Sequence, residues 1–339
     1  MAIRVLIVDD SAFMRNALGK MLSSDPEISV VGTARDGQEA LEKVAELRPD
    51  LVTMDVEMPR MDGIEALRRI MATKPVPVIM VSSLTTDGAR ATLEALEIGA
   101  ADFVPKNLSE LSVNILKIQE ILLDKVKQIG RRKVPRPARQ GGHAAPAAAP
   151  QGTTARSAYR TERRIAIVAI GTSTGGPKAL QDVIPKLPKG FPVPVVVVQH
   201  MPAAFTGPLA ERLNGLSRIP VKEAEEGEAV KPGVVLVAPG RGHLSLRRER
   251  FGECVVSIAE NRPELIYRPS ADVMMASVAE QYPGRALGVI LTGMGNDGEK
   301  GMRAIKASGG RTIAQDEETC VVYGMSRAVV EAGLADKVV

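Results

Sequence analysis

The chain has 339 residues, more than one hydrophobic core usually serves, so we expect two domains. Hydrophobic residues make up 45% and charged residues 25%, as in ordinary soluble proteins, while 3% aromatic residues and no Trp argue against a nucleic-acid surface that stacks bases on rings. The net charge of +4 comes from residues 131–160, which hold seven Lys or Arg and no acid, leaving 37 basic against 40 acidic residues elsewhere. A DNA-binding protein would carry such charge on a folded face.

Cysteine content and the N-terminal segment indicate the compartment. Two cysteines, Cys254 and Cys320, cannot form a disulfide framework, which fits a reducing compartment. The first residues run straight into a strand pattern with no basic region before a long apolar stretch, so we expect no signal peptide. The longest apolar run, Val193–Val198, is far too short to span a bilayer. These features predict a cytoplasmic protein with no membrane insertion.

The first part of the chain, residues 1–130, alternates between strand and helix patterns. Short apolar runs predict strands at Val5–Val8, Ser29–Gly32, Leu51–Met54, Val78–Val81 and Asp102–Val104. Helical periodicity lies between them, at Ala12–Leu22, Gln38–Leu47, Gly63–Met71 and Gly88–Ile98, followed by a longer helix over about Leu108–Ile129. This alternation predicts a parallel sheet covered by helices on both faces.

Residues 131–160 are rich in Pro, Gly, Ala and Arg and have no hydrophobic periodicity. Such a segment has almost nothing to bury, so we interpret it as an extended interdomain linker. The alternative is a basic patch that contacts acidic lipid or a receptor.

The alternation resumes in residues 161–339. Strands are predicted at Ile165–Ile170, Val193–Val198, Val234–Val237, Val255–Ala259, Ala286–Leu291 and Arg311–Ala314. Helices are predicted at Lys178–Leu187, Ala203–Leu216, Ala271–Glu280, Lys300–Ala307 and Ser326–Ala332. We therefore expect a second domain of the α/β class with a doubly wound, mostly parallel sheet. Open sheets of this kind place their functional groups at the carboxyl ends of strands.

Charged residues at strand ends mark a candidate site in the first domain. Asp9 and Asp10 end the first strand, Asp55 ends the third, and Lys106 follows the fifth. Adjacent carboxylates repel unless a cation lies between them, and hard oxygen ligands suit Mg²⁺. Asp55 could then accept a phosphoryl group, which Lys106 would pair with. The alternative is that these are ordinary loop acids.

A Gly-rich turn follows the first strand of the second domain, in the sequence IAIVAIGTSTGGPK. A phosphate-binding loop would need an intact G-K-[ST], which Pro177 breaks, and the dinucleotide fingerprint G-x-G-x-x-G is absent. The run from Gly171 to Gly175 satisfies G-x-S-x-G between a strand and a helix and would expose Ser173 as a nucleophile.

A serine nucleophile needs a base, and the chain has three histidines. His143 lies in the linker, His200 ends a strand, and His243 lies between two short strands; the strand end favours His200 over His243. Asp297 follows the strand Ala286–Leu291 and could hold the imidazole tautomer, although Asn-Asp-Gly is also a common turn. Together the three strand-end groups predict a Ser–His–Asp site.

The first domain resembles the receiver domain of two-component response regulators. The resemblance rests on LIVDDSAFMR, MDVEMPRMDG, VSS and DFVPK, in that order over residues 1–125. It implies a flavodoxin-like fold in which a histidine kinase phosphorylates Asp55. The implied Mg²⁺ ligands are Asp10, Asp55 and the backbone carbonyl of Glu57, beside Asp9. The implied switch residues are Lys106, Ser82 and Phe103. Asn107 departs from the pattern, since many receivers have Pro there.

The second domain resembles the chemotaxis protein-glutamate methylesterase family. GTSTGGP, VVVVQHMP, APGRGH, YRPSADVM and LTGMGNDG carry the resemblance over residues 164–338, and a receiver in front is the family's arrangement. It implies a Rossmann-like fold with catalytic residues Ser173, His200 and Asp297. Further implied are an oxyanion hole at the backbone N–H of Met294 and a neighbouring Thr174. Ser326 stands where the family commonly has Pro, and we expect it to affect only a helix start.

The resemblance implies an activity and partners. The expected activity is phosphorylation-regulated hydrolysis of glutamyl γ-methyl esters, and deamidation of glutamines, on methyl-accepting chemoreceptors. The expected phosphodonor is a chemotaxis histidine kinase, with Mg²⁺ in the receiver and no cofactor for the ester chemistry. Other classes stay open: a DNA-binding output domain, for which we find no helix-turn-helix with a basic face, a nucleotide-binding domain, or a catalytically silent scaffold.

Overall fold

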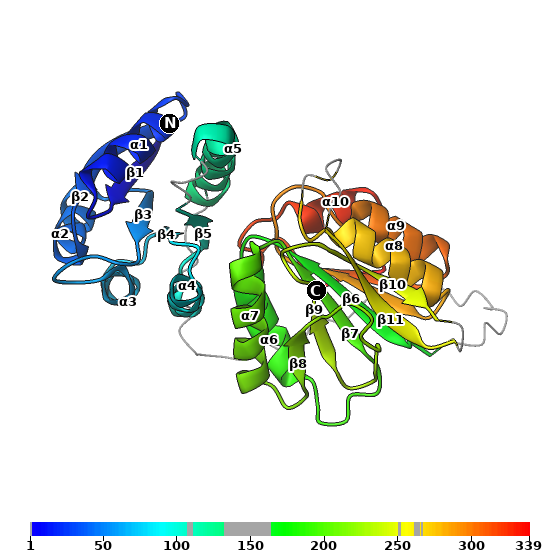
Figure 1. The fold of residues 1–339 in the computed structure, drawn as a ribbon. Coiled ribbons are helices and arrows are strands. Elements are labelled where there is room, and N and C mark those ends of the chain that lie inside the picture. The colour runs from blue at the N-terminus through cyan, green and yellow to red at the C-terminus, as the bar shows by residue number, and fades with distance from the viewer. Residues whose placement is uncertain (1, 107–110, 132–163, 250–251, 261–264, 266) are drawn as a thin grey trace, which may run out of the picture.

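The computed structural model describes residues 2–106, 111–131, 164–249, 252–260, 265 and 267–339, without the side chains of 111–118. Most of the predicted linker, with His143, and Asn107 lie outside this range. Two α/β units lie side by side in Figure 1, the N-terminal one in blue to teal and the C-terminal one in green to red. Over the part of the chain described, no helix is both long and apolar enough to cross a bilayer.

The N-terminal unit contains a five-stranded parallel sheet in the order β2-β1-β3-β4-β5. Its strands are β1 (Ile3–Val8), β2 (Ile28–Ala34), β3 (Leu51–Asp55), β4 (Val78–Ser82) and β5 (Asp102–Pro105). Its helices are α1 (Ala12–Ser23), α2 (Gly37–Leu47), α3 (Gly63–Thr73), α4 (Thr86–Ile98) and α5 (Leu111–Gly130). The predicted strands and helices of this unit are confirmed over the described residues; the predicted start of the last helix, at about Leu108, lies outside them. Strands β3 and β4 are buried throughout, as expected for a parallel sheet covered on both faces.

The C-terminal unit contains a seven-stranded parallel sheet in the order β14-β13-β12-β6-β7-β9-β8, and an antiparallel pair, β10-β11. The strands are β6 (Ile167–Thr172), β7 (Val195–Gln199), β8 (Val221–Glu223), β9 (Val235–Val237), β10 (His243–Arg248), β11 (Cys254–Ala259), β12 (Ala286–Ile290), β13 (Arg311–Ala314) and β14 (Lys337–Val338). The helices are α6 (Gly176–Val183), a 3₁₀ turn η1 (Ile184–Lys186), α7 (Ala203–Leu216), α8 (Ala271–Gln281), α9 (Glu299–Ala307) and α10 (Met325–Glu331). The mostly parallel α/β fold is confirmed, whereas β8, β10 and β14 are additional to the predicted strands.

Strand register brings three strand ends to one edge of the sheet. Thr172 of β6 pairs with Gln199 of β7, and Gly171 pairs with Ile290 of β12. The residues that follow these strands therefore emerge together, as parallel strands require. This edge carries the candidate active site.

The two units contact each other through α4 and α7, which are adjacent in Figure 1. Arg212 of α7 donates to the carboxylate of Glu97 in α4, with Nε 3.1 Å from Oε1. Beside this ion pair, the rings of Phe103 in β5 and Phe205 in α7 stack with their centroids 4.5 Å apart. Both rings belong to a buried hydrophobic cluster that includes residues of both sheets. The N-terminal unit thus packs through α4 and β5 against α7 of the unit that carries the candidate active site.

Close packing at Gly63 gives a test of the N-terminal unit. A Cβ at Gly63 would lie 1.9 Å from the carbonyl oxygen of Asp55, so Gly63→Ala should lower the free energy of unfolding by about 2 kcal/mol or more. Gly19→Ala is the matched control, because its Cβ would meet only Ile7, at 3.9 Å, in the middle of α1; it should raise stability by about 0.5–1 kcal/mol. Urea unfolding of the full chain measures both, and equal effects would contradict this packing argument.

Candidate active site

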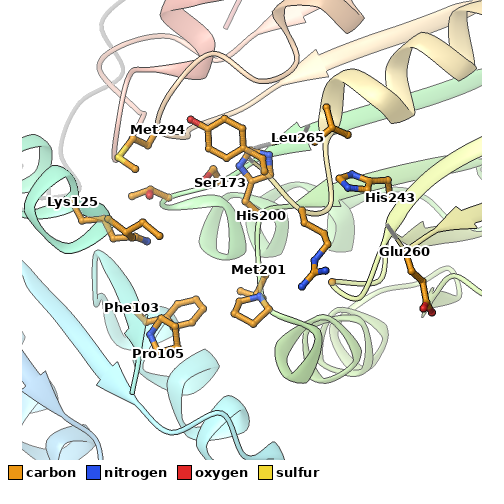
Figure 2. Close-up of a pocket in the computed structure, with 16 residues that line it drawn as sticks. Phe103, Pro105, Lys125, Ser173, His200, Met201, His243, Glu260, Leu265 and Met294 are labelled. Carbon is orange, nitrogen blue, oxygen red and sulfur yellow. The ribbon is translucent and has the colours of Figure 1, made fainter. Parts of the chain in front are cut away.

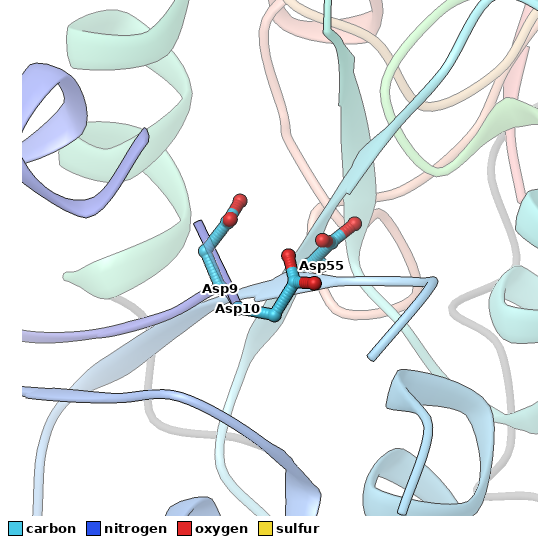
Figure 3. Close-up of side chains that lie close together, drawn as sticks. All are labelled: Asp9, Asp10 and Asp55. Atoms are coloured by element: carbon cyan, nitrogen blue, oxygen red, sulfur yellow. The ribbon is translucent and has the colours of Figure 1, made fainter. Parts of the chain in front are cut away.

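Three acidic side chains gather at the carboxyl edge of the first sheet (Figure 3). Ligand oxygens of Asp9, Asp10 and Asp55 all lie within 4.8 Å of one another. Asp9 and Asp55 are buried, and Lys106 Nζ lies 2.9 Å from Asp9 Oδ2 and 2.5 Å from Asp55 Oδ2. One ammonium group faces three carboxylates, so the site keeps an excess of negative charge. The donor set is hard oxygen, which fits a divalent cation such as Mg²⁺.

The electrostatics of Asp55 follow from this arrangement. Burial raises the pKa of Asp55 to about 6, and the charge of Asp9 adds to the rise, while the hydrogen bond from Lys106 opposes it. Glu57 lines the same small pocket as Asp10 and Asp55. An added cation would favour the charged carboxylate at this position.

Of the three predicted switch residues, only Lys106 bonds the carboxylate cluster. The hydroxyl of Ser82 donates to the carbonyl of Gly88, 3.1 Å away in α4, while Ser83 lines the acidic pocket. Phe103 is buried at the interface with α7. Thus Lys106 contacts the acidic site, whereas Ser82 and Phe103 face α4 and the second unit.

The Gly-rich turn after β6 presents Ser173 at the start of α6. The N–H of Ser173 donates to Thr292, and its carbonyl accepts from Gln199 Nε2 at 2.9 Å. Gly175 has φ +78°, which favours glycine, and a Cβ at Gly176 would lie 1.7 Å from Thr172 Oγ1. The glycines are therefore required for the tight turn that exposes Ser173.

His200 and Asp297 form a hydrogen-bonded pair at the same sheet edge. Nε2 of His200 lies 2.7 Å from Oδ2 of Asp297, and Nδ1 is buried with no hydrogen-bond partner among the described residues. Asp297 also accepts from Ser270 Oγ at 2.9 Å and from the N–H groups of Ala271 at 2.6 Å and Asp272 at 3.1 Å. These donors belong to the N-cap and first turn of α8, where a negative charge is favoured.

Hydrogen bonding sets the protonation of Asp297. Burial alone would raise the pKa of this carboxyl group, but the hydrogen bonds from His200 and from the first N–H groups of α8 hold it below its usual value. An ionised Asp297 accepts the Nε2–H of His200 and leaves the lone pair on Nδ1. His200 is thereby prepared to accept a proton at Nδ1.

One pocket of about 860 Å³ joins these groups (Figure 2). Ser173, Thr174, His200 and Met294 line it, and Figure 2 labels Ser173, His200 and Met294 among the lining residues. His243, the other candidate base, is the first residue of β10 and also lines the pocket. Asp297 accepts its hydrogen bond from His200, which favours His200 as the base. The structure therefore brings together the predicted nucleophile, base and carboxylate from three strand ends.

The loop that holds Met294 lies against the nucleophile turn. A Cβ at Gly293 would lie 2.8 Å from the Cβ of Ser173, so only glycine allows this approach. The prediction that Ser326 affects only a helix start was wrong. Its buried hydroxyl donates to the carbonyl of Leu291 at 3.2 Å, at the beginning of the Met294 loop.

The first unit supplies one wall of the pocket. Phe103, Pro105, Ile121 and Lys125 line it opposite His200, as Figure 2 shows for the labelled Phe103, Pro105 and Lys125. At the base of this wall, Thr174 Oγ1 donates to Oδ2 of Asp102 at 2.6 Å. The same carboxylate pairs with Lys125, and both Thr174 and Asp102 are buried.

Some contributing residues were missed in the sequence. Ser270 had a signal, because a Ser before the helix starting at Ala271 is a typical N-cap. Gln199, which binds the carbonyl of Ser173, and Tyr267, whose ring lies on His200, stand in the motifs VVVVQHMP and YRPSADVM. Nothing in those motifs showed their contacts, because the contacts join distant segments.

Known families match both units. The family described as CheB methylesterase matches residues 168–339, and that described as response regulator receiver domain matches residues 5–115. Together these matches define a response regulator whose output domain is a methylesterase.

Full-length relatives specify the family. The chain is 52% identical to protein-glutamate methylesterase/protein-glutamine glutaminase 1 of Oleidesulfovibrio alaskensis, over 99% of this chain and 96% of that one. It is 46% identical to the protein-glutamate methylesterase/protein-glutamine glutaminase of group 1 operon of Pseudomonas putida. That match covers 100% of this chain and 96% of the relative. The fold is similar to the Thermotoga maritima CheB methylesterase catalytic domain, with 50% identity and a TM-score of 0.50 over 51% of this chain and 92% of that one. The chain belongs to the protein-glutamate methylesterase/protein-glutamine glutaminase family of enzymes.

The lowered pKa of Asp297 predicts a pH-dependent contribution to stability. Because the pKa is lowered on folding, this stability is present above the ordinary value of 3.8 and is lost as the pH falls through the folded value. Asp297→Asn should therefore be less stable than the wild type at pH 6, by a margin that shrinks toward pH 3. Urea unfolding at each pH measures this margin, with the exposed Asp182→Asn as control. A margin that is independent of pH would contradict the assignment.

Proposed function

We propose that this enzyme hydrolyses glutamyl γ-methyl esters, and deamidates glutamines, on methyl-accepting chemoreceptors through a Ser–His–Asp mechanism. The observation that carries the proposal is the hydrogen bond between Asp297 and His200, which lines one pocket with Ser173. The family supports the same assignment, since the named relatives are methylesterases and glutaminases. We further propose a cytoplasmic location and no nucleic-acid partner.

The mechanism assigns one role to each group. Nδ1 of His200 takes the hydroxyl proton as Ser173 attacks the γ-carbonyl carbon. The N–H of Met294 donates to the oxyanion, an interaction worth a factor of about 10²–10³ in rate. The imidazolium returns its proton to the departing methoxide, so methanol leaves, and water then hydrolyses the acyl-enzyme to a free glutamate. With glutamine, ammonia leaves in place of methanol.

Asp297 supports both protonation states of the base. Its four hydrogen bonds keep it ionised, so it stabilises the imidazolium that forms when His200 accepts the proton. His200 becomes neutral again when its proton passes to the leaving group. No cofactor is proposed for this step.

We propose that phosphorylation of Asp55 by a chemotaxis histidine kinase controls the esterase. Mg²⁺ held by Asp10, Asp55 and the carbonyl of Glu57, beside Asp9, would neutralise the incoming phosphoryl group. The switch would involve Lys106, Ser82 and Phe103. The position of Phe103 and Lys125 in the wall of the pocket that His200 lines supports a model in which the unphosphorylated receiver restricts the pocket. We assign residues 1–130 to the receiver, 131–160 to the linker and 161–339 to the catalytic domain.

Removing the nucleophile tests the esterase proposal. Ser173→Ala should lower methanol release from methylated receptors on the order of 10³-fold or more, because no other group in the mechanism forms the acyl-enzyme. The measurement is methanol release with Thr92→Ser, a conservative change in α4 outside the pocket, as control. Retained activity in Ser173→Ala would refute the nucleophile assignment.

The ion pair between α4 and α7 tests the regulatory proposal. Arg212→Glu places two like charges together and should raise methanol release in the absence of a phosphodonor several-fold, because it weakens the receiver contact. Glu97→Arg in the same chain restores opposite charges and should restore the low basal rate. With a small phosphodonor and Mg²⁺, wild type should be stimulated and Asp55→Asn should not. Equal stimulation of both, or no effect of Arg212→Glu, would count against receiver control.

A further inference from the structure

The ring of Tyr267 covers the imidazole of His200. The two ring centroids are 4.6 Å apart and the ring planes differ by only 8°. Tyr267 lines the same pocket as Ser173 and His200. The mechanism above assigns this ring no role.

A single hydrogen bond does not fix the orientation of the base. The contact to Asp297 locates Nε2 of His200, but the ring can still swing about the Nε2···Oδ2 axis. Nδ1 has no partner among the described residues, so no second hydrogen bond sets the ring plane. A flat aromatic face parallel to the imidazole restricts this swing, because any tilt would clash or lose the stacked contact.

The far end of the same ring meets the loop after β12. A Cβ at Gly295 would lie 2.2 Å from the hydroxyl oxygen of Tyr267 and 3.0 Å from its Cζ. Gly295 has φ +81° and directly follows Met294, whose N–H is the proposed oxyanion donor. One side chain therefore packs against both the general base and the backbone next to the oxyanion hole.

The segment that carries Tyr267 also holds the carboxylate. Ser270, Ala271 and Asp272, three to five residues further along, donate the hydrogen bonds that hold Asp297. A short stretch of chain leading into α8 thus sets the plane of the imidazole and the position of its partner.

We propose that Tyr267 is a positioning residue, whose flat ring keeps Nδ1 of His200 directed at Ser173 and keeps the Met294–Gly295 backbone in place. This inference rests on the proposed hydrolase function. The shape of the ring carries the role, and the hydroxyl does not act as a base. Burial, with the charge of Asp297, raises the pKa of Tyr267, so the hydroxyl stays protonated at neutral pH.

Two substitutions in the full-length chain separate the flat ring from its hydroxyl and its bulk. Tyr267→Phe keeps the ring, whereas Tyr267→Leu keeps an apolar side chain without a flat face. In methanol release from methylated receptors, Tyr267→Leu should lower kcat about 10–100-fold and keep KM within about twofold of wild type. The reason is that a misdirected base affects the chemical step more than substrate binding. Phe should keep kcat within about threefold of wild type. A Leu variant with wild-type kcat, or a Phe variant as slow as Leu, would overturn the proposal.

A second readout does not depend on activity. The imidazole proton signals of His200, assigned by their loss in His200→Gln, should be shifted upfield by the stacked ring in wild type and in Tyr267→Phe. They should lose this shift in Tyr267→Leu. If the His200 imidazole signals were the same in wild type and Tyr267→Leu, the positioning role would be overturned, even if kcat fell.

The two readouts also keep the proposals apart. If Ser173→Ala abolishes methanol release while Tyr267→Leu leaves kcat and spectrum unchanged, the hydrolase stands and the positioning role falls. If wild-type methanol release does not depend on Ser173, the proposed mechanism falls. The His200 spectrum of Tyr267→Leu then still decides whether Tyr267 orients the imidazole.

Discussion

The carboxylate of Asp297 is the interaction on which the catalytic unit depends. It accepts from His200, from the hydroxyl of Ser270 and from the N–H groups of Ala271 and Asp272. A buried carboxylate is costly unless it is fully hydrogen-bonded, and these four donors come from the end of β7 and the start of α8. The loop after β12 that carries Asp297 must therefore meet both elements. The arrangement that satisfies the charge also assembles the site.

Strand β5 connects the receiver site to the catalytic pocket over a very short distance. Lys106, which binds Asp9 and Asp55, comes only four residues after Asp102, which binds Thr174 next to the nucleophile. Phe103, between them, stacks on a ring of α7. Any shift of β5 that accompanies a new charge partner for Lys106 would also act on the Asp102 and Phe103 contacts. The proposed coupling needs no long chain of intermediates, because one strand and the residue directly after it carry all three groups.

The sequence predicted the parts of this structure that follow from periodicity and from strand ends. Both parallel sheets could be predicted, and Ser173, His200 and Asp297 could be placed together because each follows a strand of one sheet. The short strands β8 and β14, with three and two residues, are too brief to show a period. The contact of Thr174 with Asp102 leaves no pattern, because it joins residues 72 positions apart in different units. The same holds for ring contacts, which depend on tertiary packing alone.

The two acidic sites of the chain use the same sheet geometry for opposite purposes. At the esterase site, hydrogen bonds outweigh burial and the pKa of Asp297 is lowered, so its charge is fixed. At the receiver site, burial and Asp9 outweigh Lys106 and raise the pKa of Asp55 to about 6, so the charge there is only partly compensated. A carboxylate whose oxygens are fully hydrogen-bonded keeps one arrangement. A cluster with uncompensated negative charge instead changes its contacts when a cation or phosphoryl group binds. The first property suits the role proposed for Asp297, which is to orient the base through every turnover. The second property suits the phosphorylation proposed for Asp55.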